Sequence, residues 1–242
     1  KVRMALRFKS VAYRSLDALA LAEHERLAAV NRRAEVPVLD DAGVVVVGSA
    51  DILAYLEDRF PSPPLLPPGA AARAQARRWQ RIADTVLDAI IHDMSLWVWP
   101  THHRTDAPPA GLIEAASADL ATILGELDAT LGAGEFVCGG VSIADVALFP
   151  HVSSLRLVGF SLEPFPAVRR WSHAMRRLAM VREDLDLVRR SVAEKFGSGP
   201  SPYEADKVVW RGDRIEWLLA HGFADWFRAE MDAGRVLIPA PV

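Results

Sequence analysis

The sequence predicts a protein of two parts, a small α/β domain followed by an all-helical domain. Two short runs rich in β-branched residues lie in the first quarter of the chain, at 36–39 and 44–47, with helical patterns on either side. A proline-rich stretch at 61–69 follows, and proline continues neither a helix nor a central strand. Beyond it, apolar residues recur every three or four positions, which is typical of amphipathic helices that pack against one another.

Apolar spacing also predicts the elements that come before the first β-branched run. Residues 1–9 carry apolar side chains on one face and predict a helix that begins without a capping residue, and residues 18–30 predict a second helix. Residues 11–17, between these helices, predict a strand.

The segment around Pro37 and Ser49 indicates a ligand site. Proline is accepted in a strand only where no ladder N–H is needed, so Pro37 marks an edge, a bulge or a cis peptide bond beside a ligand. The second run ends at Gly48 and leads into a helix whose N-cap we expect to be Ser49. Because a helix start offers free backbone N–H groups and a positive dipole end, and Ser49 adds a hydroxyl, this position predicts a site for a carboxylate.

The chain beyond the linker is dominated by helical patterns. One long amphipathic helix is predicted from Trp79 to Trp97 and ends before Pro100, and a second is predicted over 113–131 and closes at Gly132. Two such apolar stripes bury each other and give a helical bundle.

Ser142 and Asp145 form a capping box at the start of a further helix. In this motif the serine hydroxyl and the carboxylate three residues later satisfy backbone N–H groups of the first turn. The box is preceded by the run at 136–140 and followed by an aromatic segment at 165–171.

Taken together, these motifs resemble the cytosolic glutathione transferases over about residues 1–190. The resemblance implies a thioredoxin-like glutathione-binding domain at 1–60, without its first strand, a linker at 61–69 and the family's all-helical C-terminal domain at 70–196. The capping box then belongs to the folding module of that helical domain, where its role is stability.

The resemblance also implies which residues bind glutathione. Val36 and Pro37, joined by a cis peptide bond, would pair with the backbone of the glutathione cysteine, and Gly48 with Ser49 would hold the γ-glutamyl end. Gly48 stands where the family usually has glutamate, so it keeps a backbone N–H but supplies no carboxylate for the ligand's ammonium group.

The catalytic residue is not identified by the resemblance, because the Ser, Tyr or Cys that stabilises the glutathione thiolate is expected upstream of Lys1. Trp97 and Trp99, near the end of the long helix, are candidates for lining the electrophile pocket, with core packing as the alternative.

Residues 197–242 lie outside the resemblance and predict a helical C-terminal extension. A joint rich in glycine, serine and proline precedes an aromatic-rich stretch that is interrupted at Gly222. This stretch is either a helical hairpin that seals the bundle or a lid over the electrophile pocket.

Composition limits the partners. The chain has 242 residues and a net charge of −3, without the basic excess of a nucleic-acid-binding protein. No apolar run reaches the roughly 18 residues of a membrane span, and Cys138 is the only cysteine, so we expect a cytoplasmic protein without disulfides. His102 and His103 lack further ligands at the spacing that zinc uses, so no metal is expected.

Two functions remain open at this stage. The first is a glutathione transferase-like enzyme of detoxification, a homodimer that uses glutathione as co-substrate and conjugates its sulfur to the alkyl or aryl group of a small hydrophobic electrophile. The second is a non-catalytic interaction or ligand-binding protein of the same fold, which Gly48 favours. A Ser, Tyr or Cys four to seven positions before Lys1 would indicate the enzyme, and an aliphatic residue there the binding protein.

Overall fold

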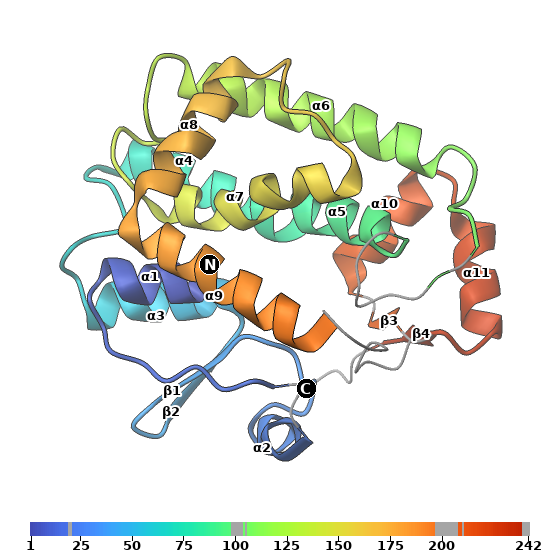
Figure 1. Ribbon diagram of the computed structural model, residues 1–242, viewed down its shortest axis with the longest axis horizontal. Coiled ribbons are helices and arrows are strands. Elements are labelled where there is room, and N and C mark those ends of the chain that lie inside the picture. The colour runs from blue at the N-terminus through green and yellow to red at the C-terminus, as the bar shows by residue number, and fades with distance from the viewer. Residues whose placement is uncertain (19–20, 98–103, 105, 197–207, 210, 239–242) are drawn as a thin grey trace.

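A computed structural model describes residues 1–18, 21–97, 104, 106–196, 208–209 and 211–238. Figure 1 shows the arrangement, in which the N-terminal elements lie below a bundle of long helices and the C-terminal helices pack at one end of that bundle. None of the described helices is both long enough and apolar enough to cross a membrane.

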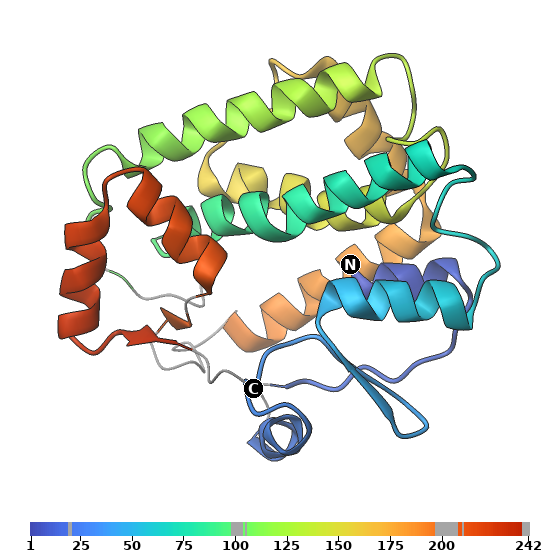
Figure 2. The ribbon, with the colours of Figure 1, turned by 180° about the vertical axis from the view of Figure 1, so that it is seen from behind.

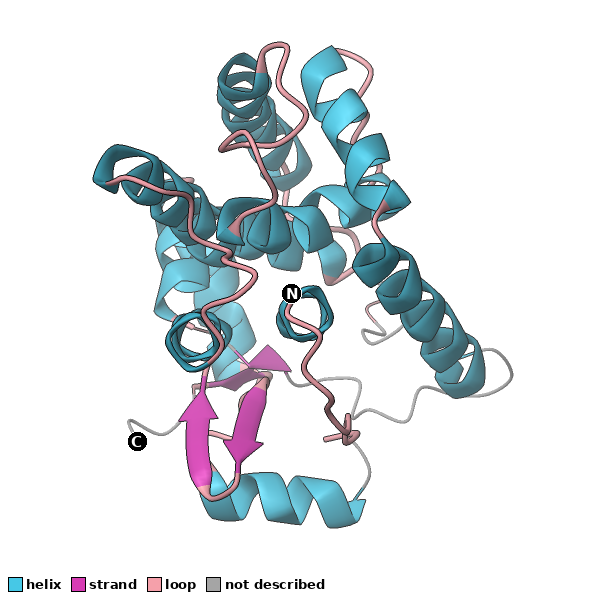
Figure 3. Cartoon of the chain, turned by 90° about the vertical axis from the view of Figure 1, so that its left-hand side faces the viewer, coloured by secondary structure: helices cyan, strands magenta, loops and turns pink. Residues whose placement is uncertain are grey.

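The N-terminal part consists of three helices and a hairpin within its described residues. The helices are α1 (Val2–Phe8), α2 (Leu21–Val30) and α3 (Ser49–Arg59). Strands β1 (Val38–Asp41) and β2 (Val44–Val47) pair antiparallel. Figure 3 shows this hairpin with α2 on its side away from the helical domain.

The strand expected at 11–17 does not form. These residues follow α1 without regular secondary structure, and the first backbone N–H of the segment, on Val11, donates to the carbonyl of Leu6. A strand needs a neighbour that satisfies its backbone groups, and the described residues offer this segment none.

The long helix predicted from Trp79 to Trp97 is helical over most of that length but not uniform. It consists of α4 (Ala70–Ile82), a π-helical segment η1 (Ala83–Leu87) and α5 (Asp88–Ser95) in direct succession. A π-helical turn shifts the register of the faces on either side of it and is frequent at functional sites.

Four further α-helices and a short 3-10 helix complete the bundle. The predicted helix at 113–131 is present as α6 (Leu112–Leu131), and it is followed by α7 (Ile143–Ser154), α8 (Pro166–Arg177) and α9 (Ala179–Phe196). A short 3-10 helix, η2 (Leu155–Val158), continues α7. α7 lies at the centre, and most of its side chains belong to the hydrophobic core.

The C-terminal extension forms a helical hairpin, α10 (Gly212–Ala220) and α11 (Ala224–Asp232). Gly222 lies between them with φ +81°, a left-handed conformation that glycine adopts without strain. Trp217 and Leu218 of α10 are buried in the main core, and Figure 2 shows α10 against α5. β3 (Val208–Val209) and β4 (Val236–Leu237) pair in parallel at the base of the hairpin. The extension thus packs on the bundle as a hairpin, and a role as a lid over an electrophile pocket stays a prediction.

The capping box holds the centre of the bundle through one buried carboxylate. Asp145 has no exposed surface and accepts hydrogen bonds from the Val137 N–H at 3.1 Å, the Ser142 N–H at 2.9 Å and the Ser142 hydroxyl at 2.8 Å. The Trp171 indole N–H donates to it at 2.8 Å. Asp145 thus joins the loop before α7, the first turn of α7 and helix α8.

Two ionic clusters fix α1 between the two parts of the chain. Asp184 of α9 accepts from Arg3 at 2.5 Å and from Arg7 at 2.9 Å. At the other end of α1, the buried Lys9 ammonium contacts the Glu57 carboxylate at 2.7 Å and donates to the carbonyl of Phe60 at 2.7 Å. These contacts tie α3 and the linker to α1, and α1 to the helical bundle.

We expect Asp145→Asn to lower the free energy of unfolding by about 3 kcal/mol, because the new amide group turns donors toward buried donors. Urea unfolding monitored by tryptophan fluorescence measures the effect. Asp58→Asn, at an exposed carboxylate of α3, is the control and should change stability by less than about 0.5 kcal/mol. Equal midpoints for the two variants would contradict the structural role of Asp145.

Candidate active site

The predicted ligand segment folds into one compact corner of the N-terminal part. The peptide bond between Val36 and Pro37 is cis, as the family resemblance implied, and β1 begins at the next residue. The Gly48 N–H donates to the Pro37 carbonyl at 3.0 Å and extends the β1–β2 ladder by one bond. This bond places the cis-proline loop directly beside the first residue of α3.

The N-cap of α3 is Gly48 and not the expected Ser49. Gly48 has φ +90°, a conformation that disfavours residues with a side chain, so the sharp turn from β2 into α3 requires glycine at the cap. Ser49 is then the first helical residue, and it is partly exposed. The first-turn N–H groups of α3 have no partner within the helix, as at any helix start, and such groups are what an anion site uses.

Asp51 is a site candidate that the sequence analysis missed. A Cβ atom placed on Gly48 would lie 3.8 Å from the Asp51 Oδ2 atom, so this exposed carboxylate reaches the region where a side chain at position 48 would begin. Asp51 stands in the first turn of α3, where a carboxylate also interacts favourably with the helix dipole. Its spacing from Ser49 was the signal that could have found it.

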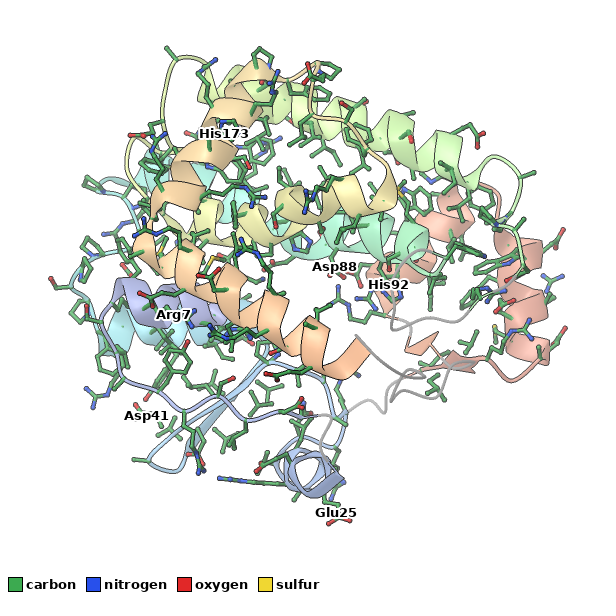
Figure 4. All side chains as sticks on the ribbon, in the orientation of Figure 1. Arg7, Glu25, Asp41, Asp88, His92 and His173 are labelled. Carbon is green, nitrogen blue, oxygen red and sulfur yellow. The ribbon has the colours of Figure 1, made fainter. Side chains whose placement is uncertain are left out.

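A layer of charged side chains lies where η1 and α5 meet the C-terminal hairpin. Asp88, labelled in Figure 4, contacts the guanidinium groups of Arg211 at 2.6 Å and Arg214 at 2.9 Å. Burial would raise the pKa of Asp88, but Arg214 and Arg211 outweigh burial and the pKa is lowered. Asp88 is therefore ionised at neutral pH.

The same two arginines act on the cis-proline loop. The pKa of Glu35 is lowered, chiefly by its hydrogen bonds from Arg33 and further by the positive charges of Arg211 and Arg214. Glu35 stands one residue before Val36 and its cis bond, so charges of the C-terminal extension act on a residue that adjoins the predicted glutathione segment. No pattern in the sequence links these positions, which are about 175 residues apart.

Burial shifts the pKa of two groups near this layer toward the neutral form. It raises the pKa of Asp93 on α5 well above its ordinary value, and neither carboxyl oxygen has a hydrogen-bond partner among the described residues. It lowers the pKa of His151 on α7 to about 4, so this ring is neutral at pH 7.

Lys1 and Arg3 are both engaged in ion pairs. Lys1 contacts Asp84 of η1, and Arg3 contacts Asp184. These pairs hold the start of α1 against the helical domain. The thiol-activating residue expected before Lys1 stays a prediction.

Four side chains, those of Trp97, Arg104, Trp226 and Glu230, form a cluster between the end of α5 and α11 that we call the clasp. The Trp97 ring lies 5.8 Å from that of Trp226, and the Arg104 guanidinium lies 5.3 Å and 5.5 Å from the two ring centres. Arg104 also contacts Glu230 at 2.5 Å and Asp106 at 2.6 Å. Trp97 is partly exposed, and its role in an electrophile pocket stays a prediction.

Three of the residues discussed from the sequence lie outside the described residues, namely Trp99, His102 and His103. Within the described part of the chain, no group of three or more His, Cys, Asp or Glu side chains has the arrangement of a metal site.

Comparison with known proteins identifies the family. Residues 1–64 match the family "Glutathione S-transferase, N-terminal domain", and residues 98–174 match "Glutathione S-transferase, C-terminal domain". The chain therefore belongs to the glutathione S-transferase family, as the sequence motifs indicated. This assignment confirms the predicted fold class, a thioredoxin-like domain followed by an all-helical domain.

Individual relatives include transferases and an isomerase. The chain is 38% identical over 168 residues to "Probable glutathione S-transferase GSTU1" of Oryza sativa subsp. japonica, covering 62% of this chain and 68% of the rice protein. It is 31% identical over 175 residues to "Probable maleylacetoacetate isomerase" of Caenorhabditis elegans, covering 70% and 79%. The crystal structure of a glutathione S-transferase from Rhodospirillum rubrum F11 has a TM-score of 0.63 and 26% identity, covering 75% of this chain and 84% of that one.

The hydrogen bonds of Glu230 in the clasp lead to a prediction about how the stability of the fold depends on pH. Burial would raise the pKa of Glu230, but hydrogen bonds from Arg235 and Arg104 outweigh burial and lower it to about 2. A lowered carboxyl pKa stabilises the fold above the unfolded value near 4.5, and this stability is lost as pH falls from about 4.5 toward 2.

We therefore expect Glu230→Gln to cost about 2 kcal/mol at pH 7 and progressively less below pH 4.5, measured by urea unfolding. Glu216→Gln, at an exposed residue of α10, is the matched control. If Glu230→Gln and the control were equally stable at pH 7, the clasp would not hold the hairpin.

Proposed function

We propose that this chain is a glutathione-dependent enzyme that binds glutathione at the corner formed by the cis-proline loop and the start of α3. The observation that carries the proposal is the hydrogen bond from the Gly48 N–H to the Pro37 carbonyl. It sets the cis Val36–Pro37 peptide, at the start of β1, beside the helix N-terminus at Gly48 and Ser49. Backbone groups next to a strand end suit a peptide ligand, and the helix start suits its carboxylate.

The chemistry proposed for this corner is nucleophilic attack by the glutathione sulfur on a small hydrophobic electrophile, held between the two domains. The protein's contribution is to position the two reactants and to stabilise the thiolate. The activating residue is expected before Lys1, and Trp97 and Trp99 are the proposed apolar walls of the electrophile pocket. Such an enzyme needs glutathione as co-substrate and no metal.

Asp51 is proposed to replace the glutamate that the family usually carries at position 48. Its carboxylate lies in the first turn of α3, next to Ser49. A charge-assisted hydrogen bond from the γ-glutamyl ammonium to Asp51 would compensate for the missing side chain at Gly48.

The family membership supports a proposal about assembly and location. We propose a cytoplasmic homodimer. Arg78 of α4 already pairs with Glu126 of α6 within the chain at 2.5 Å, whereas Arg77 and Arg81 are exposed. Acidic groups of a second subunit would be needed opposite those two residues if α4 lies at the dimer interface.

Isomerisation of a carboxylate-bearing substrate is the second candidate reaction. One of the relatives is named as a maleylacetoacetate isomerase, and its substrate is an acid. In this chain Arg211 and Arg214 supply positive charge next to the cis-proline loop. These guanidinium groups would bind a substrate carboxylate at the domain boundary.

The first test is isothermal titration of glutathione into the native protein, including residues upstream of Lys1. We expect micromolar to low-millimolar affinity and a weakening of about fivefold in Ser49→Ala and in Asp51→Asn, because each loses one hydrogen bond to the ligand. Ser117→Ala on α6 is the matched control. Unchanged affinity in both site variants would place the ligand elsewhere.

Measurements of turnover then distinguish an enzyme from a non-catalytic binding protein of the same fold. Binding together with conjugation of an uncharged chloronitroarene supports the enzyme, and binding without turnover of either an aryl halide or a maleyl acid supports the non-catalytic binding protein. Sedimentation velocity on the same sample reports whether it is the homodimer.

The second test concerns Arg211 and Arg214, the proposed ligands of a substrate carboxylate. The double variant Arg211→Gln/Arg214→Gln should raise the KM for a maleyl acid about tenfold or more and change the KM for the uncharged chloronitroarene by less than about twofold, since only the acid loses a charge-assisted bond. Arg228→Gln on α11 is the control for net charge. Equal changes for both substrates would show that the arginines act through stability and not through substrate recognition.

A further inference from the structure

A second group of arginines lines a hollow on the helical domain, among residues of η2, α8 and α9 and the loop between η2 and α8. The hollow has a volume of about 480 Å³, and its lining includes a set of basic and polar side chains: Arg156, Arg169, Ser172, His173, Arg176 and Arg189. It shares no residue with the candidate active site. His173, labelled in Figure 4, marks the place on α8.

The positive charge of this hollow is only partly compensated. Arg169 contacts Glu163 at 3.3 Å and Arg189 contacts Asp186 at 2.6 Å, both between largely exposed side chains. Arg156 and Arg176 have no carboxylate within 4 Å among the described residues. Four guanidinium groups therefore face two carboxylates, and two positive charges are left over.

Arg176 shows that these arginines repel one another. Its guanidinium is half-buried and lies 5.4 Å from the centre of the Phe149 ring. Burial lowers the pKa of Arg176, and the nearby charges of Arg156 and Arg189 lower it further. A bound anion would relieve this repulsion and would gain more from Arg176 than from a fully solvated arginine, because the partly buried group is less well hydrated.

The rest of the lining suits a small ligand with several oxygens. Ser172 is buried, with 6% of its surface exposed, and His173 stands beside it with an exposed ring. Leu162 adds an apolar wall. The volume falls within the range of small-molecule sites, and planar guanidinium groups bind phosphate oxygens in pairs.

We propose that this hollow is a binding site for a small molecule carrying at least two phosphate groups, separate from the glutathione site. Two uncompensated arginines require an anion of more than one charge, and adjacent phosphates provide this within the available volume. A nucleic acid would need a longer basic surface, and the chain as a whole has a net charge of −3.

The test is isothermal titration of inorganic pyrophosphate into the native protein at low ionic strength. We expect a Kd below about 1 mM in the native protein, weakened about tenfold in Arg176→Gln and in Arg156→Gln. Arg190→Gln, at an exposed residue of α9 outside the hollow, has the same loss of charge and should leave the Kd unchanged. Pyrophosphate should also shift the His173 ring resonances in the NMR spectrum.

Four outcomes would overturn the proposal. No binding at 10 mM pyrophosphate would exclude the site, and equal weakening in Arg190→Gln would indicate only diffuse attraction to surface charge. Tighter binding of a short single-stranded oligonucleotide than of pyrophosphate, with all three variants affected, would indicate a nucleic-acid surface instead. Loss of binding in Ser49→Ala would show that pyrophosphate binds at the glutathione corner.

Discussion

The buried carboxylate of Asp145 is the constraint on which the helical domain depends. It accepts hydrogen bonds from two backbone N–H groups, a hydroxyl and an indole, so a single side chain fixes the start of α7 against the preceding loop and α8. Burial raises the pKa of Asp145, although its hydrogen bonds from Val137, Ser142 and Trp171 oppose that shift. α7 in turn packs against α4, which continues through η1 into α5, and α5 contacts α10 of the C-terminal hairpin.

The position of the glutathione corner is determined by a second set of buried ionic contacts. Lys9 and Glu57 join α1 to α3, and Glu57 also accepts the backbone N–H groups of Leu65 and Leu66 in the linker. Arg3 and Arg7 join α1 to Asp184 in the helical domain. Because α1 is held at both ends, the start of α3 is fixed relative to η1 and α5.

The C-terminal hairpin lies outside the residues that match the family models, and it links the helical domain with the glutathione corner. Its core residues Trp217 and Leu218 seal the bundle, while Arg211 and Arg214 at its start reach Asp88 and act on Glu35. The hairpin is therefore both a structural seal and a source of charge beside the cis-proline loop.

The sequence by itself determined the capping box and most of the helices, because these depend on local spacing and backbone preference, and its resemblance to the family implied the fold class and the cis Val36–Pro37 bond. The N-cap of α3 was misassigned to Ser49, since only the turn geometry shows that Gly48 needs a positive φ. The expected strand at 11–17 failed because strand formation depends on a neighbouring strand. The approach of Arg211 and Arg214 to Asp88, and of Arg156 to Arg176, was decided by tertiary structure alone, because charges that meet across helices distant in the chain leave no periodic signal in the sequence.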